Sequence, residues 1–265
     1  MTDSVLLHTD SRGVATLTLN RPEKHNAFDD AMIADMTAKL KKLDSDDAIR
    51  VVVLTASGRT FCAGGDVNWM RSMAKFGERE NMEDSMKLAE LMDVLDSLSK
   101  PTLVKVQGPA YGGGVGLVAC CDIAIASDHA KFALTEVRLG LVPSVISPYV
   151  IGAIGDREAR RFFLTAEPID AKQAHHIGLV HEVVTTDILE ETIDMLVTAL
   201  LKGGPKALLA AKALIADQTK TDHQALKKKT AKLIAELRVS EEGQEGLTAF
   251  LEKRPPRWIK KDSHD

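Results

Sequence analysis

Cysteine is scarce in this chain, which has three in 265 residues: Cys62, Cys120 and Cys121. Adjacent cysteines rarely pair with each other, and an odd number among mostly apolar neighbours suits reduced thiols. The sequence also lacks the Cys and His spacing that is typical of a metal site. We therefore expect reduced thiols, no metal centre and a cytoplasmic location.

Long apolar runs are absent as well. No stretch approaches the roughly 18 residues that are needed to cross a bilayer. Residues 1–4 do not begin a basic-then-apolar targeting signal. The hydrophobic fraction of 45% and the charged fraction of 27% are ordinary for a soluble globular protein. We expect a soluble protein with no membrane partner.

An excess of positive charge is also missing, since the formal net charge is −4. Proteins that bind nucleic acids need a basic surface to displace counterions, so we expect no nucleic-acid partner. A few local Lys and Arg residues could still hold one anionic ligand. The length suffices for one large domain with a substantial core.

The first two thirds of the chain alternate between strand and helix patterns. Residues 5–10 and 14–20 are predicted strands, joined by a turn at 11–13 into a hairpin. The further predicted elements are a helix after Asp29, strands at 51–55, 103–106, 122–126 and 131–133, and helices at 78–98 and 115–121. Strands that alternate with helices indicate an α/β architecture.

The last third is helical and rich in Ala, Leu and Lys, with breaks at 203–205 and 221–222. Its apolar faces contain Leu208, Ala211, Leu214 and Ile215, and then Leu226, Leu233 and Leu237. Such faces pack either against another subunit or on their own domain, and the pattern leaves both open. We divide the chain into a core at 1–190, which carries the site, and a helical region at 191–265.

Two turns of small residues are the main functional signal. They are Phe-Cys-Ala-Gly-Gly-Asp at 61–66 and Tyr-Gly-Gly-Gly-Val-Gly at 111–116. Two bare backbone N–H groups aimed at one point form an oxyanion hole, and a helix start after the second turn would add positive potential. Close packing of a helix on a strand would also explain the second turn. Neither turn has the pattern of a P-loop or of a dinucleotide-binding loop.

One carboxylate, Glu136, follows the next strand-like run. A carboxylate near an enolate can move a proton to or from carbon, most effectively if burial raises its pKa toward neutrality. On its own, a Glu beside Thr135 is more typical of a surface or capping position. The glycine turns make the catalytic interpretation worth testing.

Five motifs in order resemble the crotonase (enoyl-CoA hydratase/isomerase) superfamily. They lie at 21–27, 61–66, 108–114, 121–124 and 140–143, and the similarity extends to 178–180. The resemblance implies an α/β fold, a right-handed spiral of strand–strand–helix (ββα) turns closed by a C-terminal helical trimerisation region. It also implies an acyl-CoA substrate and a homotrimer, or a hexamer formed by two trimers.

The same resemblance assigns roles to individual residues. The N–H groups of Gly65 and Gly113 would hold the thioester oxygen, and Glu136 would be the catalytic acid–base. Further residues would contact the CoA or the acyl group: Lys24, His25, Ala27, Ala63, Asp66, Trp69, Gly116, Phe250 and Lys253. By the same resemblance, Phe250 and Lys253 correspond to the family's C-terminal helix, which would reach the nucleotide in the same or a neighbouring active site. No cofactor is implied, because coenzyme A arrives as part of the substrate.

Gly116 departs from the family pattern, because two-glutamate hydratases carry their first catalytic glutamate at this position. Glycine has no side chain with which to hold water. Four alternatives stay open: a hydratase in which Glu136 alone orients water, a Δ3,Δ2-enoyl-CoA isomerase in which it moves a proton between C4 and C2, a different crotonase reaction such as decarboxylation or thioester hydrolysis, or a non-catalytic binding protein.

A finer resemblance favours hydration. Residues 68–70, 113–119 and 136–149 are similar to bacterial 3-methylglutaconyl-CoA and isohexenylglutaconyl-CoA hydratases, which act in leucine and terpene breakdown. Such substrates carry a second carboxylate, so a cation or hydrogen-bond donor is expected near it. Arg71, Arg138, Ser144 and Ser147 are candidates for this contact.

Overall fold

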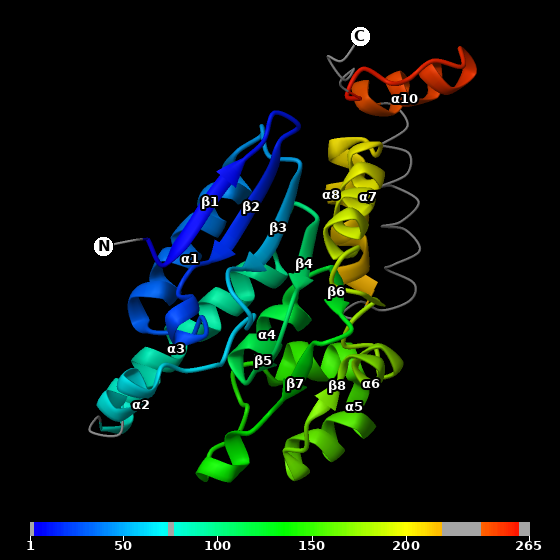
Figure 1. The fold of residues 1–265 in the computed structure, drawn as a ribbon. Coiled ribbons are helices and arrows are strands. Elements are labelled where there is room, and N and C mark those ends of the chain that lie inside the picture. Colours follow the sequence, from blue (N-terminus) through cyan, green and yellow to red (C-terminus); the bar gives the residue numbers. More distant parts are fainter. Residues whose placement is uncertain (1–2, 74–76, 219–239, 260–265) are drawn as a thin grey trace.

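A six-stranded sheet forms the centre of the molecule, and the computed structural model describes residues 3–73, 77–218 and 240–259 (Figure 1). The strands, in spatial order, are β1 (Val5–Thr9), β2 (Val14–Leu19), β3 (Val51–Ala56), β4 (Thr102–Val106), β6 (Ile123–Ser127) and β9 (Glu182–Val184). β1 and β2 form the predicted antiparallel hairpin, and all later pairs are parallel.

A smaller second layer runs beside this sheet. It contains β5 (Ala110–Tyr111), β7 (Lys131–Ala133) and β8 (Ile169–Asp170). Two single bridges, Phe28 with Gly65 and Cys62 with Ala110, extend the same layer toward the N-terminus. The chain therefore visits the large sheet, the second layer and a helix in turn, which confirms the predicted ββα order.

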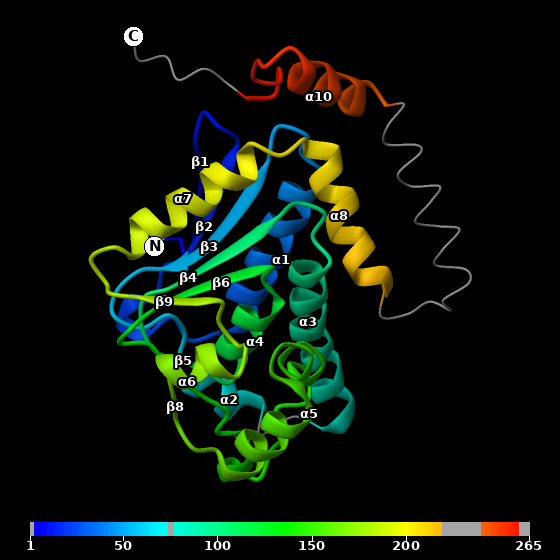
Figure 2. The ribbon, with the colours of Figure 1, turned by 90° about the vertical axis from the view of Figure 1, so that its right-hand side faces the viewer.

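Helices cover both faces of the large sheet (Figure 2). The helices of the core are α1 (Asp30–Ser45), α2 (Val67–Met73), α3 (Glu78–Asp96), α4 (Gly113–Cys120), α5 (Ser147–Thr165) and α6 (Ala171–His176), with short 3-10 turns at Pro22–Lys24 and Glu136–Leu139. They are followed by α7 (Leu189–Leu201), α8 (Pro205–Gln218) and α10 (Glu241–Leu251). Within the described ranges, no helix is long and apolar enough to cross a bilayer.

The sequence of β3 is an almost continuous apolar run, and the two faces of this strand show why. Val52 and Leu54 face the main core with α1 and α3, whereas Val51 and Val53 face α7 on the other side. A strand that is buried on both faces has no need for polar alternation. Its position is therefore fixed by hydrophobic burial from two sides.

The helices of the helical region pack on the core to different extents. α7 buries Ile193 and Val197 on the sheet, so this helix packs on its own domain. α8 leaves Ile215 72% exposed, so its apolar face is only partly covered in the single chain. The predicted face with Leu226, Leu233 and Leu237 lies outside the described residues, and the boundary at 190/191 stays a prediction.

Candidate active site

The first glycine turn presents one bare N–H group. Phe28 N–H donates to Gly64 O at 2.7 Å, and Asp66 N–H donates to Phe28 O at 2.7 Å. Gly64 C=O and Gly65 N–H belong to one planar trans peptide, so this N–H points away from Phe28. Within the described residues it has no acceptor. Gly65 thus supplies a donor that no described residue uses.

The second glycine turn presents another bare N–H group, that of Gly113. Gly112 has a φ of 51° and precedes α4, whose first residue is Gly113. Gly112 O accepts from Val115 N–H at 2.9 Å, so the Gly113 N–H of the same peptide points out of the helix N-terminus. In the described part of the chain this N–H has no acceptor either. The helix dipole adds positive potential at this point.

Direct contacts join the two turns, as the sequence interpretation requires. Tyr111 N–H donates to Cys62 O at 2.8 Å. A Cβ on Gly114 would lie 2.8 Å from both Cβ and O of Cys62, so only glycine permits this approach. The Cys62 thiol is fully buried, and burial raises its pKa to about 12. Cys62 is therefore a packing residue and not a nucleophile.

Glu136 reaches the second turn from the start of the 3-10 turn after β7. A Cβ on Gly112 would lie 3.0 Å from Oε1 of this carboxylate. Oε2 is buried and has no hydrogen-bond partner among the residues that the structure describes. Burial raises the pKa of Glu136, opposed by a hydrogen bond from its own backbone N–H. A buried, unpartnered carboxylate oxygen is costly for folding and is suited to proton transfer.

Ile146 occupies the space that a side chain at position 116 would need. A Cβ on Gly116 would lie 2.3 Å from Cγ2 and 2.9 Å from Cβ of Ile146, which is 3% exposed. Gly116 is itself buried, and its predicted contact with substrate stays a prediction. Ile146 cannot be identified as a neighbour of Gly116 from the sequence, because only the folded chain brings this residue against α4.

The predicted CoA loop lies against the first turn. Lys24 Nζ is 3.3 Å from Asp66 Oδ2, and His25 Nδ1 is 3.0 Å from Thr60 Oγ1. Ala63 N–H donates to His25 O at 3.0 Å, while Ala27 is buried. The loop residues that the resemblance implies are therefore brought together beside Gly65.

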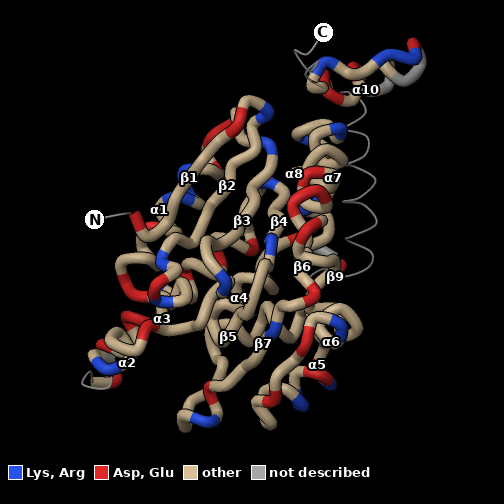
Figure 3. The backbone as a smooth tube through the Cα atoms, in the orientation of Figure 1, with Lys and Arg blue, Asp and Glu red and all other residues tan. Residues whose placement is uncertain are grey.

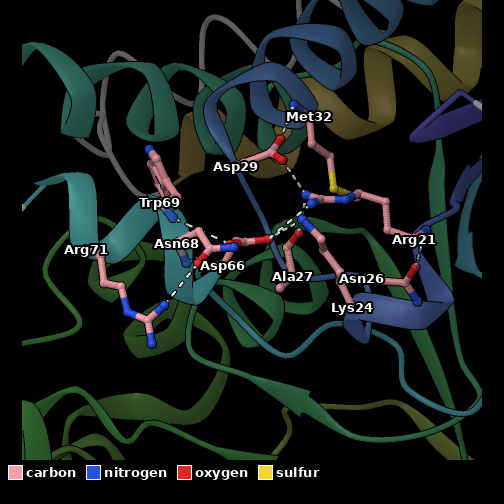
Figure 4. Close-up of polar contacts among 10 residues, drawn as sticks. All are labelled: Arg21, Lys24, Asn26, Ala27, Asp29, Met32, Asp66, Asn68, Trp69 and Arg71. Atoms are coloured by element: carbon pink, nitrogen blue, oxygen red, sulfur yellow. Dashed lines mark hydrogen bonds and ion pairs between the residues drawn. The ribbon is translucent and has the colours of Figure 1, made fainter. Parts of the chain in front are cut away.

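Asp66 is the centre of a buried polar cluster (Figure 4). Its carboxylate accepts from Asn68 N–H at 2.8 Å, at the start of α2, and from Arg21 Nη2 at 3.1 Å. Burial alone would raise the pKa of Asp66, but the hydrogen bonds from Asn68 and Lys24 outweigh it and hold the pKa below its usual value. Arg21 lies in the motif at 21–27, but the sequence does not reveal that its partner is Asp66, 45 residues away.

A cavity of about 460 Å³ opens beside this cluster, lined by Lys24, Asp66 and Trp69. A Cβ on Gly65 would lie 3.7 Å from the Trp69 ring and 3.3 Å from Met70 Cγ, so both side chains lie against the first turn. The rest of the lining is mostly acidic: Asp29, Asp30, Glu80, Glu83 and Asp84, with Lys87. Elsewhere, Figure 3 shows Lys and Arg interspersed with Asp and Glu over the described elements.

The two predicted CoA contacts near the C-terminus, Phe250 and Lys253, lie in α10 and just after it. α10 lies at the opposite end of the molecule from α2 in both views (Figures 1 and 2). Lys253 is exposed just after α10, and the side chain of Phe250 lies outside the described part. Within one chain Lys253 is thus remote from the Lys24 loop. Among the described residues no group of three His, Cys, Asp or Glu is arranged to hold a metal ion.

Comparisons with known proteins find similarity over nearly the whole chain. The chain matches the family model "Enoyl-CoA hydratase/isomerase" over residues 9–261. The crystal structure of a putative enoyl CoA hydratase/isomerase (crotonase) from Legionella pneumophila has a TM-score of 0.92 and 45% identity, covering 97% of this chain and 99% of that one. The crystal structure of an enoyl-CoA hydratase from Shewanella pealeana has a TM-score of 0.93 and 43% identity, covering 97% of this chain and 96% of that one. The 2,3-dehydroadipyl-CoA hydratase of Escherichia coli is 32% identical over 254 residues, 96% of this chain and 98% of that protein.

Proposed function

The chain belongs to the enoyl-CoA hydratase/isomerase family, and from that premise we propose that it adds water across the 2,3-double bond of an acyl-CoA thioester. One observation carries the proposal. The Glu136 carboxylate has a buried, unpartnered Oε2 and lies through Oε1 against the second turn, and among the described residues the N–H groups of Gly113 in this turn and of Gly65 in the adjoining turn have no acceptor.

The two N–H groups hold the thioester oxygen. As water attacks C3, the electrons of the double bond move onto this oxygen and form an enolate, which the two donors stabilise. Removing one such donor typically costs about 2.7–4 kcal/mol of transition-state stabilisation. Gly65 and Gly113 act through backbone atoms, so their function depends on how the fold aims each peptide.

Glu136 handles the proton in both steps. The carboxylate takes one proton from water while the water oxygen bonds to C3. The resulting carboxylic acid then returns that proton to C2, which collapses the enolate and restores the carboxylate. One carboxylate is sufficient because the two transfers are sequential. A pKa raised by burial suits a group that must both accept and donate.

The proposed substrate is a β-branched enoyl-CoA of the glutaconyl type, with a second carboxylate. The similarity of residues 136–149 to glutaconyl-CoA hydratases supports it, and a 32% identical relative is named for dehydroadipyl-CoA, also a dicarboxylic acyl group. Arg71 lies on α2 with Trp69 and donates to Asn68 Oδ1 at 3.1 Å. Arg138 is exposed two residues after Glu136. These two cations are the groups we propose for the distal carboxylate.

A second candidate function is Δ3,Δ2-isomerisation. Ile146 fills the position where a second carboxylate would help to hold water, so the described site offers one acid–base group with an apolar neighbour. A single carboxylate could take a proton from C4 and deliver it to C2. This reaction would use the same two N–H donors.

Incubation with 3-methylglutaconyl-CoA, crotonyl-CoA and a 3-enoyl-CoA separates these functions. A product heavier by one water supports hydration, and a higher kcat/KM for the glutaconyl thioester supports the substrate class. Conversion of the 3-enoyl-CoA without a change in mass supports isomerisation. No turnover of any thioester would favour a non-catalytic binding protein.

We also propose that the protein assembles as a homotrimer or a hexamer in the cytoplasm. We place the interface on the helical region, where Ile215 on α8 is 72% exposed and would gain free energy on burial. Light scattering of the purified protein gives the mass of the assembly directly. A monomer at micromolar concentration would contradict this proposal.

A further inference from the structure

Phe28 connects the two halves of the donor pair. Its backbone N–H binds Gly64 O and so fixes the peptide that carries the Gly65 N–H. Its ring lies against the other half, because a Cβ on Gly113 would be 2.8 Å from Cε2 of Phe28. The residue is 1% exposed. Phe28 therefore sets the direction of one donor and the spacing to the other.

Arg21 holds Phe28 from both sides. Its Nη1 donates to Ala27 O at 3.0 Å and is paired with the Asp29 carboxylate, so it contacts the residues before and after Phe28. Its Nη2 donates to Asp66 Oδ2 at 3.1 Å, and Asp66 follows Gly65 directly. The guanidinium thus spans both segments of the bridge between Phe28 and Gly65 (Figure 4).

The arginine is itself held in place. It is 9% exposed, and its backbone N–H donates to Asn26 Oδ1 at 2.8 Å. A guanidinium presents several N–H donors in a rigid plane, whereas a lysine ammonium is a compact charge on a flexible stem. Lysine could keep one charge pair here but could not reproduce all three contacts.

We propose that Arg21 is a positioning residue of the oxyanion hole. By holding Ala27, Asp29 and Asp66 together, it keeps the peptide between Gly64 and Gly65 turned so that the N–H faces the thioester oxygen. The inference rests on the proposed function, since it assumes that this N–H stabilises an enolate. It assigns Arg21 no contact with the substrate.

The test measures enolate stabilisation separately from CoA binding, with acetoacetyl-CoA as the probe. This thioester ionises to an enolate with its own near-ultraviolet band, so titration of the complex gives the apparent pKa of the bound probe. The variants are Arg21→Lys and, as a matched control, Arg12→Lys, which weakens ion pairs with Asp10 and Asp194 far from the turns. Affinity for free CoA and thermal stability are measured on the same samples.

We expect the wild type and Arg12→Lys to lower the pKa of the bound probe below that of free acetoacetyl-CoA. Arg21→Lys should move it back toward the free value and lower kcat by roughly 100-fold, with CoA affinity unchanged, because small displacements of a positioned group have effects of that size. A wild type that does not lower the probe pKa would contradict the proposed function. If the wild type and Arg21→Lys lower the pKa of the bound probe equally, only the role of Arg21 is contradicted.

Asp29→Asn provides a second variant if Arg21→Lys does not fold. Asparagine retains an oxygen for the Met32 N–H at the start of α1, so the helix cap survives while the charge pair with Arg21 is lost. A smaller shift of the probe pKa in the same direction supports the inference. A probe pKa equal to that of the wild type overturns it.

Discussion

Ile146 occupies the space beside Gly116 so closely that a Cβ on Gly116 would lie 2.3 Å from its Cγ2 atom. Gly116 belongs to α4, and Ile146 immediately precedes α5, so the contact lies where these two helices meet. The absence of a carboxylate at 116 is therefore a packing feature of this chain. In the proposed mechanism, Glu136 is therefore the one acid–base group that the described residues supply.

This contact predicts that Gly116→Ala destabilises the protein. The added methyl group must displace Ile146, and overpacking of a core typically costs about 1–3 kcal/mol of unfolding free energy. Urea denaturation measures the change. Gly152→Ala is the control, because a Cβ on that α5 glycine would meet nothing within 4 Å, and it should be neutral or slightly stabilising.

A double-mutant cycle tests the physical cause. Ile146→Ala alone should destabilise by leaving a cavity, but in combination with Gly116→Ala the two effects should partly cancel. Simple additivity of the two losses would show that Ile146 is not what the new methyl group meets.

The sequence predicts those parts of the site that are marked by local patterns. Glycine-rich turns, the start of the helix after Asp29 and alternating strands each depend on neighbours in the chain, so the two turns can be found from the sequence, whereas the role of Glu136 follows only from the family resemblance. Arg21 and Ile146 act on residues 45 and 30 positions away, Asp66 and Gly116, and only tertiary structure creates these pairs. Amphipathic helices likewise do not reveal what covers them, so the packing of α7 on the sheet cannot be predicted from the sequence.

Glu136→Gln should abolish most turnover while CoA affinity is retained. Glutamine preserves the shape of the side chain but cannot take a proton from water, and loss of a general acid–base group typically costs about 10²–10⁴-fold in rate. Steady-state kinetics and CoA binding test the two parts separately. Glu182→Gln, an exposed glutamate on β9, should retain wild-type rates. Substantial turnover by Glu136→Gln would remove Glu136 from its proposed role.

The raised pKa of Glu136 also predicts how stability depends on pH. The folded state binds the proton more tightly than the unfolded state, so the contribution of this group is fully present below the unfolded pKa of roughly 4.3 and is lost as pH rises through the folded pKa. Glu136→Gln should therefore melt at a higher temperature than the wild type at pH 8. The gain should vanish near pH 4. Equal melting temperatures at both pH values would contradict the burial of an ionised Glu136.

The raised pKa of Glu136 also predicts that activity falls at acid pH. Water can be deprotonated only by the ionised carboxylate, so kcat/KM decreases as pH drops through the pKa of Glu136. The midpoint should lie above the ordinary glutamate value of about 4.3. A pH–rate profile of the wild type, measured within the range where the fold is stable, gives this midpoint. A midpoint at or below the ordinary value would assign the acid limb to another group.

Lys24 is predicted to serve binding more than stability. Its Nζ lies 3.3 Å from Asp66 Oδ2, but its side chain is 45% exposed and can present a positive charge to the phosphates of CoA. Lys24→Gln should weaken CoA binding by about tenfold, near the 1.4 kcal/mol that a factor of ten represents, and should flatten the salt dependence of binding. Arg21 and the Asn68 N–H still hold the buried Asp66 carboxylate when Lys24 is removed, so the melting temperature should change little. Lys41→Gln, which removes an exposed surface pair with Glu90 at 2.6 Å, should leave CoA binding unchanged. If both variants bind CoA as the wild type does at low salt, the loop at residues 24–27 does not contact the phosphates through Lys24.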